Sequence, residues 1–483
     1  MNDEPIITQD TAAALVALAS PIQVAVEEKL KRLFPDLIVP KRLAAFQEIV
    51  KVPRFISEYL IQRAAKTTNE DKAIIGQVND FLARYRPEHK DREWLKSKIL
   101  EEGNVRLLDF FDAYTDLEGG RFLVDIPLLG VREAIVSKEI KDENENLLRG
   151  GMWGLATIGF AEMEDGPVPA LLRFVPFQVQ RCDVRYYQEA RKEFTLEEWV
   201  YTMVSTIGLN PAKYPSLREQ MILLTRLIPF VEDNTFLSEF GQPGTGKTFL
   251  YDKLSAYGRV ISGSVETPAN LFYHGTKRKP GILAVADVVL FDEVDKVRGH
   301  KMDTEVVGKL LKFMEGGSFD RQGVTITSSA SIVFGGNLRE FQTPLYRLFP
   351  DDMQHKAFFD RIHGFIFGES LPPIGRSVEF VSPSFGFTSD YFSEILHRMR
   401  HYSWTEVVRS RVKLTKGGVR DEKAISKIVS GLIKIMYPHG EITKEELRVL
   451  VDQAVAMRNR SNEQIRRIDP NADTSLVQAE VTG

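Results

Sequence analysis

The segment at residues 241–248 constrains the fold of this 483-residue chain more than any other feature. It matches the phosphate-binding pattern G-x-x-x-x-G-K-[ST] between an apolar run, residues 235–240, and a helix-forming segment, which is the context that this pattern requires. Glycines let successive backbone N–H groups approach phosphate oxygens, and a chance match in a glycine-containing loop is the alternative. We therefore predict an α/β fold with a phosphate loop made of Gly241, Gln242, Pro243, Gly244, Thr245, Gly246, Lys247 and Thr248.

Two residues of this loop carry polar side chains suited to a nucleoside triphosphate. Lys247 supplies a positive charge for the β- and γ-phosphates, and Thr248 offers a hydroxyl to Mg²⁺. The predicted cofactors are accordingly ATP and Mg²⁺.

An apolar run at residues 288–291 ends in two acids, Asp292 and Glu293. Such a run predicts a buried parallel strand, and the carboxyl ends of parallel strands line the crevice where ligands bind. Asp292 would hold Mg²⁺, and Glu293 would polarise the attacking water. An apolar strand that merely ends in acids is the alternative, and the phosphate loop makes it the weaker one.

Two further polar residues follow along the chain. Asn337 follows the apolar run at residues 331–334 after two glycines, where its amide could orient the lytic water; a turn-forming asparagine after the two glycines is the alternative. Arg361 lies further on and would reach a neighbouring subunit's nucleotide as an arginine finger. The alternative for Arg361 is a local salt bridge with Asp360.

The order of these four elements resembles the AAA+ ATPases. The segment at residues 313–326 is similar to the helix and hairpin of the MCM helicase and magnesium chelatase branch. Gly418-Val419-Arg420 is similar to the second-sensor motif of Lon-type ATPases, which implies that Arg420 senses the γ-phosphate. A solvent-facing arginine at a helix start is the alternative.

Hydrophobic periodicity divides the chain into five segments. Residues 22–117 are predicted to be helical, residues 118–190 to form a small β module, and residues 191–385 to form the α/β core. Residues 386–468 are predicted to be helical, and residues 469–483 to be a flexible tail.

A closer resemblance, to the BrxL family of Lon-like AAA+ proteins from BREX phage defence, covers residues 25–467. It rests on five segments in addition to the loop and the acidic strand, at residues 148–153, 194–199, 269–273, 360–364 and 430–434. The resemblance implies a β-barrel-like (OB-like) N-terminal module and a helical lid on the ATPase core. It also implies double-stranded DNA and other BREX components as partners, and a homo-oligomeric ring, a hexamer or heptamer with stacking of rings left open.

Longer members of the family carry a C-terminal Lon-like domain. This chain ends soon after the last predicted helix, so peptidase activity is not expected.

The charge distribution bears on DNA binding. The net formal charge is −4, yet residues 396–467 hold 16 Lys and Arg against 8 Asp and Glu. This basic stretch could face DNA or could be solvated helix surface between subunits. Residues 277–279 and Arg321 would contact DNA phosphates from loops or would simply be exposed loop charges.

Two alternatives to a DNA-translocating ATPase come from other functional classes. A protein unfoldase working with a separate protease is supported by the aromatic pair Phe272 and Tyr273, which could grip polypeptide. A scaffold that binds nucleotide to assemble is the weaker alternative.

Composition excludes several other classes of protein. The single cysteine, Cys182, cannot form an internal disulfide, and no apolar run reaches the length of a membrane-spanning helix. Acidic residues precede the apolar run at residues 12–19, which argues against a signal peptide. We expect a cytoplasmic protein with no membrane partner, in which His397 and His401 are a surface pair and not metal ligands.

Overall fold

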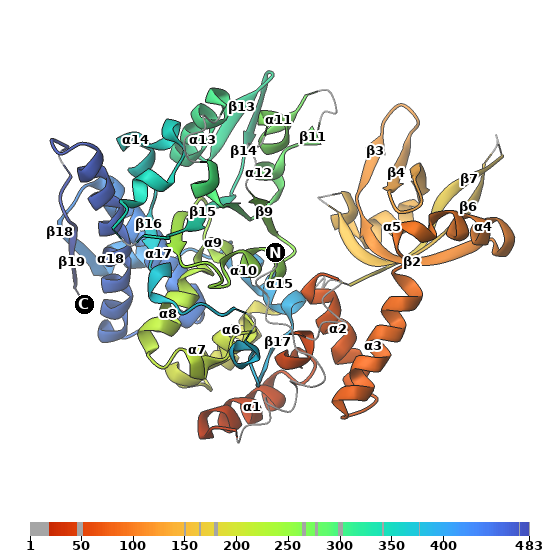
Figure 1. Ribbon diagram of the computed structural model, residues 1–483, viewed down its shortest axis with the longest axis horizontal. Helices are drawn as coiled ribbons and strands as arrows, with labels where there is room; N and C mark the ends of the chain where they lie inside the picture. Colours follow the sequence, from red (N-terminus) through yellow and green to blue (C-terminus); the bar gives the residue numbers. More distant parts are fainter. Residues whose placement is uncertain are drawn as a thin grey trace. The chain divides into compact units, whose positions relative to one another are not determined.

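The computed structural model describes residues 19–45, 52–148, 151–163, 166–177, 182–262, 267–275, 279–297, 303–340, 342–375, 377–472 and 474–482. The chain forms two compact units (Figure 1). One consists of residues 48–180, and the other of residues 1–47 together with 181–483.

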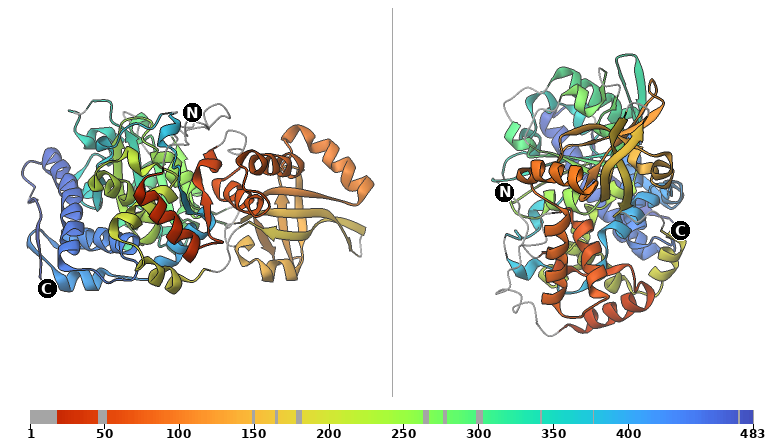
Figure 2. Two further views of the ribbon diagram at one scale, coloured as in Figure 1. Left: turned by 90° about the horizontal axis from the view of Figure 1, so that it is seen from below. Right: turned by 90° about the vertical axis from the view of Figure 1, so that its right-hand side faces the viewer.

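The smaller unit is a six-stranded sheet with helices. Its strand order is β2-β6-β7-β5-β4-β3, antiparallel except for the β5–β7 pair. The helices α3 and α4 pack against β2 (Figure 2). The strands are β2 (Asn104–Phe111), β3 (Ala113–Asp116), β4 (Arg121–Ile126), β5 (Val131–Val136), β6 (Met152–Met163) and β7 (Gly166–Pro176), and the helices are α2 (Arg54–Ala65), α3 (Asp71–Tyr85), α4 (Arg92–Glu102) and α5 (Lys138–Glu143).

The strands begin earlier than the sequence predicts, because β2 lies inside the range predicted to be helical. Gly103 ends α4 in the left-handed conformation, with φ 82°, and the chain continues as a strand. Leu107 and Phe111 face the core of the sheet. Their spacing of four residues fits one face of a helix as well as one face of a strand, and this ambiguity explains the incorrect boundary.

The first helix, α1 (Pro21–Leu33), also departs from the predicted helical segment, because it belongs to the larger unit. Its buried residues Val26 and Leu30 face that unit, and Lys29 pairs with Glu198 of α7 (Leu196–Thr206) at 2.6 Å. The strand that follows, β1 (Ile38–Pro40), pairs with β17 (Phe385–Phe387).

The larger unit is built on a parallel sheet with the strand order β16-β8-β15-β12-β9. The strands β8, β12 and β16 are buried throughout. Helix α10 packs on β9 and β12, and α9 packs on β15. The strands are β8 (Phe236–Gly241), β9 (Gly258–Ser262), β12 (Val288–Asp292), β15 (Ser331–Asn337) and β16 (Gly364–Ile366), and the helices are α8 (Leu217–Thr225), α9 (Ile228–Val231), α10 (Lys247–Lys253), α13 (Thr304–Gly316) and α14 (Lys356–Phe359).

The C-terminal part of this unit is mainly helical. Its long helices α17 and α18 pack against each other, and α18 packs on the edge strand β16 (Figures 1 and 2). The helices are α15 (Ser389–Met399), α16 (Thr405–Arg411), α17 (Val419–Met436) and α18 (Lys444–Ile468).

The sequence predicts a flexible tail, but part of the tail is ordered. The strand β19 (Gln478–Val481) pairs with β18 (Val412–Lys416). Val477 is 2% exposed, and its backbone N–H donates to Oδ1 of Asn459 on α18 at 2.6 Å. Burial of this single valine and its backbone bonds orders a segment that is otherwise polar.

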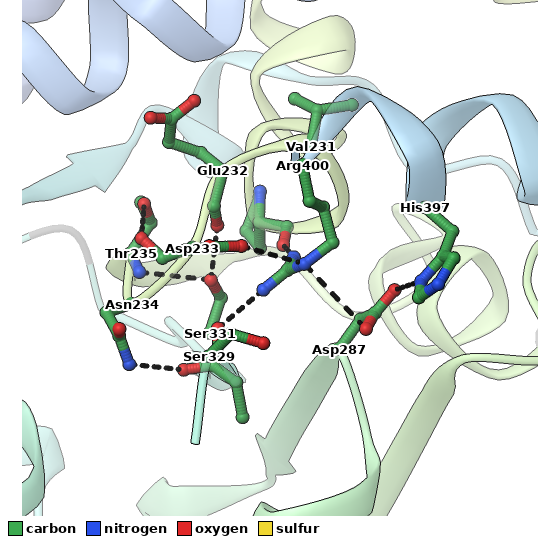
Figure 3. A network of polar contacts seen from close by, with 12 residues as sticks. Val231, Glu232, Asp233, Asn234, Thr235, Asp287, Ser329, Ser331, His397 and Arg400 are labelled. Atoms are coloured by element: carbon green, nitrogen blue, oxygen red, sulfur yellow. Dashed lines mark hydrogen bonds and ion pairs between the residues drawn. The ribbon is translucent and has the colours of Figure 1, made fainter. Parts of the chain in front are cut away.

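A polar network ties α15 to the sheet (Figure 3). Arg400 lies 3.0 Å from Asp233, just before β8, and donates to the carbonyl oxygen of Pro229 at 2.7 Å. His397 contacts Asp287 at 2.6 Å and stacks on the Tyr257 ring at 4.1 Å between centroids. His397 also lies 6.0 Å from the His401 ring between centroids, so the predicted histidine pair is present, and its His397 member additionally packs into the fold. No cluster of three metal-ligating side chains occurs in the described part of the chain.

His363 joins the edge strand β16 to β8. Its ring Nδ1 accepts from the backbone N–H of Phe236 at 2.9 Å, and the backbone N–H of His363 donates to the Phe236 carbonyl oxygen at 2.7 Å. Burial, together with the charges of Lys427 and Arg458, lowers the pKa of His363 well below its ordinary value. The ring is therefore neutral in the folded state.

We expect His363 to make the fold sensitive to acid. The unfolded state binds a proton below about pH 6.5 and the folded state does not, so this contribution to stability is full above pH 6.5 and falls as the pH drops below it. The limiting slope is about 1.4 kcal/mol per pH unit. Urea unfolding between pH 7 and pH 5 measures the effect, and His363→Asn, which keeps an acceptor but does not titrate, should lose that part of the slope. An identical slope in both proteins would contradict the prediction.

Among the described residues, no helix is both long and apolar enough to cross a membrane.

Candidate nucleotide site

The predicted phosphate loop connects β8 to α10. Gly244 and Gly246 have φ angles of 78° and 75°, a left-handed conformation that side chains disfavour. A Cβ on Gly246 would lie 2.8 Å from Cδ1 of Ile374, and one on Gly241 would lie 2.6 Å from the backbone of Gly368. The glycines of the motif are therefore required by the fold of the loop itself.

Lys247 begins α10 and is 6% exposed. Its Nζ donates to the Gln242 carbonyl oxygen at 3.1 Å and lies 3.4 Å from Oγ1 of Thr245, both neutral groups within the loop. Burial lowers the pKa of Lys247, whereas the Glu239 carboxylate raises it. A buried ammonium held by neutral oxygens of the loop is well suited to receive a phosphate anion.

Thr248 and Asp292 meet at the carboxyl edge of the sheet. The Thr248 hydroxyl donates to Oδ2 of Asp292 at 2.5 Å. A hydroxyl and a carboxylate oxygen are ligands that Mg²⁺ accepts when substrate phosphates complete its shell. These two side chains fit the ion.

Glu293 directly follows β12 in a left-handed conformation, with φ 55°. Its backbone N–H donates to Oδ1 of Asp292 at 2.8 Å, and its carboxylate pairs with Lys296 at 2.5 Å. A non-glycine residue at positive φ costs free energy and is frequent at functional sites. The turn places the second acid beside the first.

Asn337 ends β15, the strand between β8 and β12. It lies opposite Gly241 in the strand register, and its backbone N–H donates to Oδ1 of Asp295 at 2.9 Å. The structure thus brings the loop, the acidic pair and Asn337 together at one edge of the sheet.

Arg361 and Arg420 form a separate group with other partners. Arg361 Nη2 lies 2.8 Å from Oε2 of Glu315, and Arg420 pairs with both Glu315 and Asp360. The alternative of a local pair between Arg361 and Asp360 is not what the structure shows. Arg361 comes two residues before His363, which binds Phe236 at the start of β8, whereas the phosphate loop follows the end of that strand, so the two arginines lie toward the opposite edge of the sheet.

The structure contains a buried ion pair beneath the loop that the sequence-based prediction does not include. Arg226, at the end of α8, and Glu239, in β8, are 0% and 1% exposed. Arg226 Nη2 lies 2.6 Å from Oε1 of Glu239, and its Nη1 donates to the Thr245 carbonyl oxygen at 2.9 Å. The sequence does contain a signal for this pair, because Arg226 and Glu239 are charges of opposite sign that each lie in an otherwise apolar segment.

Glu239→Gln should strongly destabilise the larger unit. The substitution leaves the Arg226 charge buried without its partner, which costs about 3–5 kcal/mol of the free energy of unfolding. Urea unfolding measures this loss. Glu406→Gln is the matched control, since the Glu406–Arg409 pair is exposed and should contribute below about 1 kcal/mol. Equal losses in the two variants would contradict the prediction.

The predicted channel residues are less available than the sequence suggests. Phe272 is fully buried and packs on Phe319 at 5.0 Å between ring centroids, so it is not an exposed gripping residue. Arg321, in the hairpin of β13 (Ser318–Arg321) and β14 (Val324–Thr327), donates to the Tyr273 carbonyl oxygen and pairs with Glu305 at 3.5 Å. Lys277 and Arg278 lie outside the described residues, as does the side chain of Lys279.

Two known families match adjacent parts of this sequence. The family described as Lon-like protease BrxL-like, ATPase domain, matches residues 170–475. The family described as BREX system Lon protease-like protein BrxL N-terminal matches residues 32–160. The first match contains the loop, the acidic pair, Asn337 and both arginines.

Individual proteins are similar over nearly the whole chain. The Lon-like protease BrxL of Escherichia coli O9:H4 is 32% identical over 451 residues, covering 91% of this chain and 64% of its own length. The protein of that name from Bacillus cereus is 31% identical, covering 91% and 66%. The chain therefore spans just under two thirds of the length of these curated relatives. A candidate ATPase of known structure from Cytophaga hutchinsonii covers 60% of this chain and 97% of its own, with 14% identity and a TM-score of 0.35.

Proposed function

Because the chain belongs to the BrxL family of BREX Lon-like proteins, we propose that it hydrolyses ATP between the subunits of a ring. Hydrolysis would drive movement on, or remodelling of, double-stranded DNA in phage defence. In this proposal the larger unit is an AAA+ core with α15–α18 as its helical lid, and the sheet of the smaller unit is an OB-like module.

The separation of the two residue groups carries this proposal. Phosphoryl transfer needs cations around the γ-phosphate as the bond to the leaving oxygen breaks. Lys247 supplies one such cation within its own loop, whereas Arg361 and Arg420 pair with Glu315 elsewhere on the unit. A second copy of the chain can bring these arginines to the nucleotide.

The residues at the sheet edge have distinct roles in the proposed reaction. Thr248 and Asp292 would hold Mg²⁺, which offsets the negative charge of the β- and γ-phosphates when it is bound. Glu293 accepts a proton from the attacking water, and the Asn337 amide orients that water. Lys247 contacts the phosphates through its ammonium group.

Arg361 and Arg420 would act on a neighbour's nucleotide. Arg361 serves as the arginine finger, and Arg420 senses the γ-phosphate. Because both contact one carboxylate, they would meet the same nucleotide.

The basic C-terminal stretch supports DNA binding in part. Some of its cations are used inside the fold: Lys434 pairs with Glu232 at 2.5 Å, and Arg458 pairs with Asp421 at 2.7 Å, each with a side chain at most 2% exposed. The cations that remain exposed and available for phosphate contacts include Lys413, Lys416, Lys423, Lys444, Arg448, Arg466 and Arg467.

Measuring DNA binding across a series of salt concentrations tests whether duplex DNA is the partner of this protein. A gel-shift titration of duplex DNA with and without ATP should show an affinity that falls steeply as salt rises, because the contacts are to phosphates. Absence of binding, or an affinity indifferent to salt, would favour remodelling of protein substrates instead.

A further inference from the structure

One carboxylate bridges the two arginines that the proposed reaction needs. Glu315 Oε2 lies 2.8 Å from Nη2 of Arg361 and 3.3 Å from Nη2 of Arg420. The Glu315 side chain is 52% exposed and the Arg361 side chain 18% exposed. The three groups therefore form one cluster at the surface, made of residues from the last turn of α13, the segment just after α14 and the start of α17.

The inner side of this cluster is firmly held. Arg420 pairs with Asp360, which also lies 3.5 Å from Nη2 of Arg458. Arg458 is 1% exposed and donates to the carbonyl oxygen of Ile362 at 2.6 Å. Arg420 thus has a second anionic partner that is anchored in the fold.

Arg361 depends more on Glu315. Its Nη1 donates to the Ala357 carbonyl oxygen at 2.5 Å, and Glu315 is its ion-pair partner among the described residues. Its Nε is buried and has no hydrogen-bond partner in the described part of the chain. Without Glu315, Arg361 would lose its ion-pair partner, whereas Arg420 would keep Asp360.

Glu315 does not stabilise the helix in which it lies, α13. It lies in the last turn of α13, which ends at Gly317 with φ 68°, and an acidic residue there interacts unfavourably with the helix dipole. Its neighbours Phe313 and Met314 are buried in the core, whereas Glu315 points away from them to the arginines. Its contacts are thus with residues of the proposed reaction.

We propose that Glu315 is a positioning residue, which holds Arg361 and Arg420 side by side so that both reach the same phosphate group of a neighbouring subunit. This inference rests on the proposed function. The carboxylate offsets the repulsion between the two guanidinium groups before the phosphate arrives. Because Glu315 is half exposed, its ion pairs contribute little to stability, and its removal acts on the placement of the arginines.

ATP turnover of Glu315 variants tests the positioning role of Glu315. We expect Glu315→Ala alone to show a turnover number roughly 10- to 100-fold below the unmodified protein, from misplaced arginines, with the KM for ATP nearly unchanged. Glu315→Gln keeps the shape and an acceptor oxygen and should lose less. Glu305→Gln, on the same helix, is the matched control and should keep normal turnover.

The Glu315→Ala defect should lie in the subunit that supplies the arginines, and not in the subunit that binds the nucleotide. Mixed with Lys247→Ala subunits, which have intact arginines, Glu315→Ala subunits should gain activity above the sum of the separate preparations. Mixed with Arg361→Ala subunits, they should gain none. Recovery with Arg361→Ala, or full turnover of Glu315→Ala alone, would overturn the role of Glu315.

The same mixtures separate this inference from the proposed function. If Arg361→Ala and Lys247→Ala complement each other while Glu315→Ala retains full turnover, the shared site stands and the positioning role is wrong. If Arg361→Ala alone keeps full turnover, the shared site itself is wrong, and the role of Glu315 falls with it.

Discussion

Replacing Glu293 by glutamine is expected to stop ATP turnover while ATP binding stays intact. The amide keeps the shape of the side chain after β12 but accepts no proton from water, and loss of a general base lowers the rate by about 100- to 10,000-fold. Lys247, Thr248 and Asp292, the residues proposed to hold the nucleotide and the metal, are unchanged in this variant. Phosphate release measures the turnover, and a fluorescent ATP analogue measures the binding.

Lys296→Gln is the matched control for this variant. Lys296 pairs with Glu293 at 2.5 Å, and its side chain is 52% exposed, so its loss changes the local charge without removing the proposed base. We expect its turnover to stay within a few-fold of the unmodified protein. Substantial turnover by Glu293→Gln would reject the role given to Glu293.

Replacing Arg361 by alanine is expected to lower turnover by roughly 1,000-fold, the lower end of the range for arginine fingers. ATP binding should change little, because the phosphate loop is complete in each copy. Arg347→Ala is the control, since Arg347 is an exposed arginine that contacts Tyr346 and not Glu315. A loss of ATP binding equal to the loss of turnover would show that Arg361 acts on its own copy's loop or on folding.

Local sequence is sufficient to predict where the sheet-edge residues of the candidate site lie. The loop glycines, Lys247 and Thr248 lie in one segment, and two apolar runs place Asp292 and Asn337 at the ends of buried strands. Parallel strands bring their carboxyl ends to one edge of the sheet, so residues that follow different strands in the sequence lie close together in the fold. The strand order and the bond between Thr248 and Asp292 agree with that expectation.

The other half depends on contacts between distant parts of the chain. Glu315 and Arg420 are separated by 105 positions, and no periodicity relates them. Arg226 and Glu239 are closer in sequence, but their pairing depends on how α8 packs beneath the loop. Tertiary packing alone reveals which charges are paired.

Charge counts are misleading for the same reason. The basic excess of residues 396–467 includes Lys434, Arg458 and Arg400, which are buried in ion pairs with acids of the same unit. A count of charges treats these like the exposed lysines of β18. Burial decides which cations remain for a polyanion.

Mixing Arg361→Ala subunits with Lys247→Ala subunits tests the central claim most directly. We expect each variant to be inactive alone, whereas a mixed ring would contain interfaces where an intact loop faces an intact arginine. We predict that ATP turnover reappears on mixing and passes through a maximum near equal proportions. No recovery at any ratio, with both variants shown to assemble together, would contradict hydrolysis between subunits.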